Sequence, residues 1–249
     1  RRLGWVALAA VILQGVLGGL TVKYLLPAPI SVFHACLAQS FFCLTICFAV
    51  FTSPFWRSGS GRIETARTLA LPHLCIGFIA VVFMQLIFGA IMRHTESGLA
   101  VPDFPLAYGQ FVPDLSDSSL AKYNYDRRWN WRIDQTTSQQ IVYHMLHRVG
   151  AVLVAAVVLT AAVIILRRHG SRRTFGLPAA AAIGLLAAQI ALGAWTVWSG
   201  KSPRITTAHV VVGAALLADG VFLTLMSHRL LSVARREVAT DAAWSGVPA

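Results

Sequence analysis

Six long apolar segments, separated by shorter polar ones, dominate the pattern of the chain. They lie at about residues 4–22, 30–52, 72–92, 141–166, 177–199 and 205–227. Each is close to the ~20 residues that an α-helix needs to cross ~30 Å of hydrocarbon. The apolar residues are continuous and do not alternate, which argues against the strands of a membrane barrel. The pattern therefore predicts an all-α integral membrane protein with about six transmembrane helices.

The composition supports a membrane protein. Of the 249 residues, 56% are hydrophobic and only 12% are charged, whereas soluble domains have about 25% charged residues. The net charge of +11 does not indicate nucleic acid as a partner, because the basic residues cluster in short segments beside the apolar spans, where they set topology. The strongest such cluster is Arg167, Arg168, Arg172 and Arg173. It predicts cytoplasmic termini and places the long segment 93–139 outside.

Two parts of the chain resemble each other. Residues 14–34 align without a gap on residues 189–209, and Gln14, Thr21 and His34 recur as Gln189, Thr196 and His209. Shared membrane composition could explain matching Leu and Val, but not matching Gln, Thr and His. Each copy predicts a helical hairpin. Two hairpins of the same orientation indicate a parallel repeat about an axis along the membrane normal, and hence two pseudo-repeated helical bundles.

Three histidines lie inside the predicted spans, each one to two turns from the outer end: His34, His147 and His209. Polar residues at this depth are costly and often functional. Two imidazoles on neighbouring helices are the usual ligands of a bis-His heme. A helix–helix hydrogen bond is the alternative for a single histidine, but the matched depth and the repeat favour heme ligation. Zinc is disfavoured, since no carboxylate or Cys lies at that depth.

Other polar residues accompany these histidines. Arg148 directly follows His147, and a buried guanidinium needs an anionic partner such as a heme propionate, although the side chain could also extend to the membrane interface. His144 lies one turn before His147 and could contact a ligand or support one. Asp219 lies in the cytoplasmic half of the last span, where helix packing and a proton path both remain open. The histidines at span ends are expected to be solvated: His73, His94, His169 and His228.

The segment 93–139 contains several Pro and Gly residues, including Pro102, Pro105, Gly109 and Pro113. Such spacing predicts a defined, turn-rich structure. Because it lies over the layer of histidines, we expect it to shield them from water. Its aromatic and basic stretch at 124–132 is typical of an anchor at the membrane interface.

The sequence resembles the heme A synthase family, membrane enzymes that make heme A for terminal cytochrome oxidases. The resemblance rests on Gln-x-x-Leu-Gly-x-x-Thr-Val at 14–22 and 189–197, on His-Arg at 147–148, on His34 and His209, and on Arg-His-Thr-x-Ser-Gly-Leu at 93–99 running into Pro-Asp-Phe-Pro at 102–105. Each motif is weak alone, but the combination is specific and covers nearly the whole chain.

The resemblance implies eight helices in two similar four-helix halves, each holding one heme between two histidines. This chain would begin at the third helix, so that 1–71 form the second hairpin of the N-terminal half and 72–249 the C-terminal half. His147 and His209 would then be the axial ligands of a b-type heme, and His34 would bind the iron of the substrate heme O. The partner of His34, and a catalytic Glu one turn before it, would precede Arg1.

The implied reaction oxidises a methyl group of heme O to the formyl group of heme A by successive hydroxylations with water. This function implies a cell inner membrane, a heme O synthase that supplies the substrate and an electron acceptor; a homo-oligomer is left open. The six-span chain alone is expected not to make heme A. The four cysteines lie within spans, so the outer-loop Cys pair of some members is not carried over. A non-enzymatic bis-His cytochrome and a repeat-built transporter are the alternatives.

Overall fold

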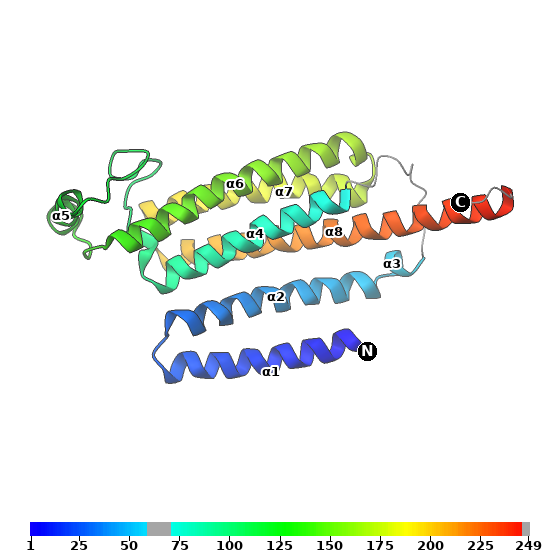
Figure 1. The fold of residues 1–249 in the computed structure, drawn as a ribbon, viewed down its shortest axis with the longest axis horizontal. Coiled ribbons are helices and arrows are strands. Elements are labelled where there is room, and N and C mark those ends of the chain that lie inside the picture. Colours follow the sequence, from blue (N-terminus) through cyan, green and yellow to red (C-terminus); the bar gives the residue numbers. More distant parts are fainter. Residues whose placement is uncertain (59–70, 246–249) are drawn as a thin grey trace.

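The computed structural model describes residues 1–58 and 71–245 (Figure 1). Its elements in chain order are α1 (Arg2–Lys23), α2 (Ala28–Thr52), α3 (Pro54–Ser58), α4 (Leu71–His94), η2 (Ser97–Leu99), α5 (Asp117–Asp126), η3 (Arg127–Trp131), α6 (Ser138–His169), α7 (Arg173–Trp198) and α8 (Pro203–Ser245). In this described part, six helices are long and apolar enough to cross a membrane: α1, α2, α4, α6, α7 and the Pro203–Arg229 portion of α8. The predicted all-α membrane fold is confirmed.

Four of the long helices form a bundle, and the other two form a hairpin beside it. In Figure 1, α4, α6, α7 and α8 lie together, and α1 and α2 lie along one side of them. The hairpin contacts the bundle through α2, which packs on both α4 and α8, while α1 packs on α2. Large apolar side chains from α4, α6, α7 and α8 fill the bundle core, among them Phe78, Val158, Phe175 and Leu216. This arrangement of two helices plus four is the framework for the sites below.

The turns of the two repeat-related hairpins have the same backbone conformation. Leu25 and Leu26 both have positive φ, of 54° and 61°, and the equivalent Gly200 and Lys201 have φ of 61° and 62°. The amide of Leu26 donates to the carbonyl of Thr21 over 2.7 Å, and the amide of Lys201 donates to the carbonyl of Thr196 over 2.9 Å. The internal repeat found in the sequence is therefore also a repeat of helix ends and turns.

Different connecting segments lie at the two ends of the long helices. The segment between α4 and α6, which includes α5, lies at one end of the molecule, whereas the N-terminus and α3 lie at the other (Figure 1). The Arg167–Arg173 turn between α6 and α7 also lies at the end opposite α5. The basic clusters used to predict topology are therefore on one side of the spans, and the long segment is on the other.

The expectation of solvated histidines at span ends is wrong for His169. This residue is only 9% exposed, and its ring centroid lies 5.7 Å from that of Phe175. The cause is the tight turn between α6 and α7, which returns Phe175 onto the last turn of α6. His73 and His228 are exposed, and His94 is half-buried.

Candidate functional site

Three helical hairpins carry the same local arrangement of side chains. In each, a Gln and a Gly four residues later on the first helix face a His on the second. The hairpins are α1–α2 with Gln14, Gly18 and His34; α4–α6 with Gln85, Gly89 and His147; and α7–α8 with Gln189, Gly193 and His209. A spacing of four residues places Gln and Gly on one helix face. Each His is thus held by its own hairpin, about two turns from the start of its helix.

The glycine lets each imidazole lie directly against the neighbouring helix. A Cβ placed on Gly18 would lie 3.3 Å from Cε1 of His34. The corresponding distances are 3.2 Å for Gly89 and His147, and 3.1 Å for Gly193. These separations are shorter than the 3.5–4.0 Å that carbon atoms prefer. The three glycines are therefore needed for close approach.

The glutamine amides hydrogen-bond the imidazoles. Nε2 of Gln85 lies 3.1 Å from Nδ1 and 3.4 Å from Nε2 of His147, and it donates to the His147 carbonyl over 2.8 Å. Nε2 of Gln189 lies 3.3 Å from Nε2 of His209. Nε2 of Gln14 lies 3.5 Å from Nε2 of His34 and donates to its carbonyl over 3.2 Å.

Several atoms of these three groups are buried without a hydrogen-bond partner. They are Nδ1 of His34 and of His209, and Oε1 of Gln14, Gln85 and Gln189. Buried polar atoms normally find partners, so a cluster of exceptions at one kind of site calls for an explanation. The three histidines are only partly buried as residues, so the protein does not enclose them completely. Imidazoles with unused nitrogens in apolar surroundings fit axial ligation of a heme iron.

The helices that carry His147 and His209 both pack against the same part of α4. Gly150, one turn beyond His147, faces Gln85 and Phe88, and a Cβ there would overlap the Gln85 side-chain oxygen. Gly213, one turn beyond His209, faces Gln189, and a Cβ there would lie 3.3 Å from Leu86 of α4. One turn of α4 therefore contacts both helices just beyond their histidines. His34 lies apart from them, in the α1–α2 hairpin.

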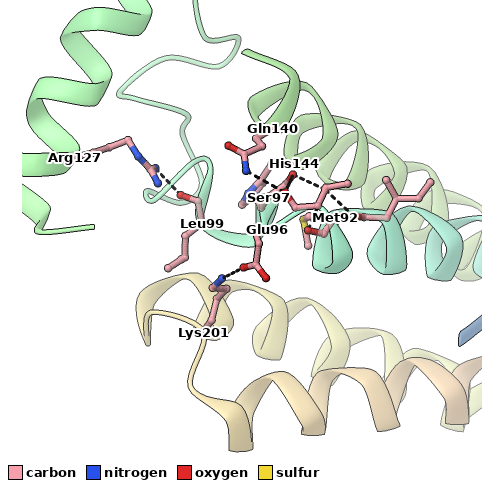
Figure 2. A network of polar contacts seen from close by, with 10 residues as sticks. Met92, Glu96, Ser97, Leu99, Arg127, Gln140, His144 and Lys201 are labelled. Carbon is pink, nitrogen blue, oxygen red and sulfur yellow. Dashed lines mark hydrogen bonds and ion pairs between the residues drawn. The ribbon is translucent and has the colours of Figure 1, made fainter. Parts of the chain in front are cut away.

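His144 and Arg148 are bound by the outer segment. Nδ1 of His144, which is only 3% exposed, donates to the Ser97 carbonyl over 3.0 Å (Figure 2). Because a carbonyl can only accept, this bond requires a proton on Nδ1. Arg148 donates to the backbone carbonyls of Leu106 and Asp103, and its guanidinium lies 5.4 Å from the Phe104 ring centroid. Arg148 thus has backbone partners beside His147; its contact with a propionate stays a prediction.

The outer segment is folded around its own small core. Ala100, Val101, Ala107 and Tyr123 pack with Ile141 of α6. The rings of Tyr108 and Tyr123 stack with centroids 3.8 Å apart. The helix α6 begins with a capping box, in which Thr137 accepts from the Gln140 amide and the Gln140 side chain accepts from the Thr137 amide. The prediction of a defined structure in this segment is confirmed.

Arg127 has a structural role that the sequence did not reveal. Residues 124–132 were expected to be an interfacial anchor, and Trp129 is indeed 61% exposed, but Arg127 is only 4% exposed. Its guanidinium donates to the carbonyls of Leu99 (Figure 2), Ala100 and Asp134 and to the Tyr108 hydroxyl. Burial raises the pKa of Tyr108, although Arg127 opposes the shift. A basic residue in an aromatic run can thus be a buried cross-link.

Gln85 and Gly89 were also missed at the sequence level. The direct repeat shows only the pairs Gln14–Gly18 and Gln189–Gly193, because the long segment between α4 and α6 breaks the alignment with His147. The shorter pattern Gln-x-x-x-Gly, which occurs on all three first helices, could have found them.

These observations define a helical membrane protein with histidines held at one level by Gln and Gly on paired helices. A sequence profile of the family described as cytochrome oxidase assembly protein matches residues 1–221. The chain belongs to this family, and the predicted resemblance is confirmed.

Curated relatives agree with this assignment. A heme A synthase of Sphingopyxis alaskensis is 31% identical over 171 residues, which are 64% of this chain and 44% of the relative. A heme A synthase of Caulobacter sp. (strain K31) is 28% identical over 226 residues, 88% of this chain and 61% of the relative. One from Caulobacter vibrioides is 29% identical over 219 residues, 83% and 57% of the two chains. The chain spans about half the length of these relatives.

Proposed function

We propose that the chain is part of a heme A synthase, which oxidises the methyl group of heme O to the formyl group of heme A for cytochrome oxidase biogenesis. The observation that carries the proposal is the set of Gln–Gly–His groups whose ring nitrogens are buried and unpartnered at His34 and His209. Membership of the family of cytochrome oxidase assembly proteins and the likeness to heme A synthases support it.

The histidines divide between two sites. His147 and His209 belong to one four-helix bundle, and their helices α6 and α8 contact the same turn of α4 just beyond the two histidines, so we assign them to a b-type heme. His34 is on the separate α1–α2 hairpin, and we assign it to the iron of heme O. When bound, the two hemes supply the redox chemistry. The chain's own part is to hold the imidazoles at fixed positions in apolar surroundings.

The outer segment would keep water from the heme. It joins α6 through the bonds of His144 and Arg148, which lie on either side of His147. Its own core includes Val101, which is fully buried. A water-excluding cover of this kind protects reactive intermediates from side reactions. Arg148 remains the candidate for a propionate contact, since a guanidinium has five N–H donors and can serve carbonyls and a carboxylate together.

We place the protein in the cell inner membrane, with the Arg167–Arg173 turn and both termini in the cytoplasm and the segment that contains α5 outside. The arginine clusters at one end of the spans support this orientation. The proposed partners are a heme O synthase as supplier, an electron acceptor and membrane lipid.

The decisive experiment is spectroscopy of the protein purified from its native gene. We expect a Soret band of a low-spin heme that His147→Ala and His209→Ala each abolish, because each removes one axial ligand. His73→Ala is the control, since His73 is exposed at the start of α4. Unchanged heme content in both ligand variants would refute the assignment.

Two further outcomes separate the alternatives. A protein without a Soret band would favour the transporter. A heme-containing product of the whole native gene that converts no heme O to heme A in a membrane assay would favour the non-enzymatic cytochrome. His34→Ala is expected to keep the low-spin heme and to lose the conversion.

A further inference from the structure

The outer segment is held firmly along one face of α6. Gln140, His144 and Arg148 follow one another at intervals of four residues, which places them on one helix face. Each of these side chains donates to the backbone of the outer segment (Figure 2). The accepting carbonyls, in the same order, are those of Thr95 at 3.0 Å, Ser97 at 3.0 Å and Leu106 at 2.8 Å. We call these three donors the α6 stripe. Because they satisfy carbonyls of irregular backbone, losing them would be costly.

The opposite edge of the outer segment meets the α7–α8 turn through more exposed contacts. Nζ of Lys201 lies 3.4 Å from Oε2 of Glu96 (Figure 2), and the two side chains are 38% and 80% exposed. The lysine stem lies against η2, since a Cβ on Gly98 would be 3.0 Å from Cδ of Lys201. The rings of Phe104 and Trp198 meet edge to face, with centroids 6.0 Å apart. An exposed ion pair contributes little, because water and salt screen it. Within the described part of the chain, this edge is therefore the weaker attachment.

The two residues of the α7–α8 hairpin that make these contacts depart from the internal repeat. The α1–α2 turn has the same backbone conformation, but Leu26 stands at the position of Lys201, and Lys23 stands at the position of Trp198. The turn itself therefore requires neither Lys201 nor Trp198. Both differences fall where the outer segment touches the hairpin, so they serve this contact.

We propose that the outer segment is a hinged cover, which stays bound to the α6 stripe and parts from the α7–α8 turn at the Glu96–Lys201 contact to let heme enter and leave. This inference rests on the proposed heme ligation and adds the route to it. The helix α6 carries His147 and α8 carries His209, so parting the segment from the turn opens the outer end of the bundle between the two ligands. The α6 stripe keeps the open segment in place, so that it closes over the same site.

The first test locks this edge in the heme-free protein from the native gene. Gly98→Cys is combined with Lys201→Cys, because a Cβ at position 98 would lie 3.8 Å from Cγ of Lys201, near the separation that a disulfide bridges. We expect the oxidised double variant to lose rapid hemin uptake, followed at the Soret band, and dithiothreitol to restore it. The two single variants are the controls. Their uptake should not respond to dithiothreitol, since the native cysteines Cys36, Cys43, Cys47 and Cys75 lie within the spans.

Lys201→Glu tests the same edge without a cross-link. It sets a second carboxylate against Glu96, so hemin uptake and release should both become roughly two- to fivefold faster. Lys122→Glu is the matched control, because it makes the same charge change at an exposed position of α5, and no ion pair of Lys122 occurs within the described residues. Equal uptake by the oxidised and reduced double variant, or uptake no faster in Lys201→Glu than in Lys122→Glu, would overturn the hinged cover and leave bis-His ligation intact. Wild-type protein that binds no heme would instead overturn the proposed function, and the inference with it.

Discussion

The close contact between Gly193 and His209 gives a sharp prediction for Gly193→Ala. The added Cβ would lie 3.1 Å from Cε1 and 3.6 Å from Nδ1 of the imidazole. Carbon atoms prefer 3.5–4.0 Å, so the ring would have to retreat by about half an ångström. A free imidazole can do so by a small rotation. An imidazole bound to iron cannot, and the strain then falls on heme binding.

The magnitude follows from the cost of overpacking. One extra methyl in a well-packed site costs about 1–3 kcal/mol. At about 1.4 kcal/mol per tenfold change in affinity, heme should bind roughly 5- to 150-fold more weakly. The same substitution improves helix formation by about 1 kcal/mol. Gly193→Ala should therefore weaken heme binding without unfolding the heme-free protein.

The assay is titration of the heme-free protein with hemin, followed at the Soret band, together with thermal unfolding. Gly184→Ala is the matched control, because it lies on the same helix and a Cβ there meets nothing within 4 Å. It should show the gain in helix formation and no loss of affinity. If Gly193→Ala bound hemin as tightly as Gly184→Ala does, the imidazole of His209 would not be fixed by a ligand, and the assignment of this histidine would fail.

Three further predictions concern the outer segment and the turns. Arg127→Leu removes the printed donors to the carbonyls of Leu99 and Asp134, each worth about 1–3 kcal/mol when left unsatisfied. Limited proteolysis should therefore cut residues 100–135 faster than in the exposed control Arg128→Leu; equal rates would contradict the cross-link. Burial raises the pKa of Tyr108, so its neutral phenol stabilises the folded segment fully below the ordinary tyrosine pKa of about 10, and this contribution is lost as pH rises through the higher folded pKa. In Tyr108→Phe, the rate of limited proteolysis of the segment should therefore rise less at alkaline pH; an unchanged pH profile would refute this. Leu25→Gly should stabilise the first hairpin by about 1 kcal/mol, because it removes the backbone strain of a leucine with positive φ. Gly200→Leu should destabilise the second hairpin, because it introduces that strain; equal unfolding midpoints for the two variants would count against this.

The spans and the histidines could be predicted from the sequence because membranes impose strong constraints. A continuous apolar segment of about 20 residues in hydrocarbon can satisfy its backbone hydrogen bonds internally only as a helix. A polar residue within such a segment is rare and therefore easy to recognise. His34, His147 and His209 were therefore recognisable without any structure. What the sequence could not show was the partner of each polar group. That depends on which helix faces touch, and two adjacent apolar faces look alike in sequence.

Arg148 and Arg127 illustrate this limit. The sequence suggested a heme propionate as the partner of Arg148 and the membrane interface as the surroundings of Arg127. The structure gives both of them backbone carbonyls of the outer segment. Such carbonyls are exposed by irregular backbone, which lacks the internal hydrogen bonds of a helix. A sequence shows that a segment is irregular from its Pro and Gly, but not which arginine will satisfy it.

The repeat has its clearest meaning at the level of single hairpins. The direct alignment relates α1–α2 to α7–α8, and the Gln–Gly–His group adds α4–α6, whose long connection hides the relationship. In each hairpin the His lies against a Gly and within hydrogen-bond distance of a Gln on the partner helix. A spacing of four residues places that Gln and Gly on one helix face, so the same pair at the same spacing produces the same contact on three helices whose sequences otherwise differ.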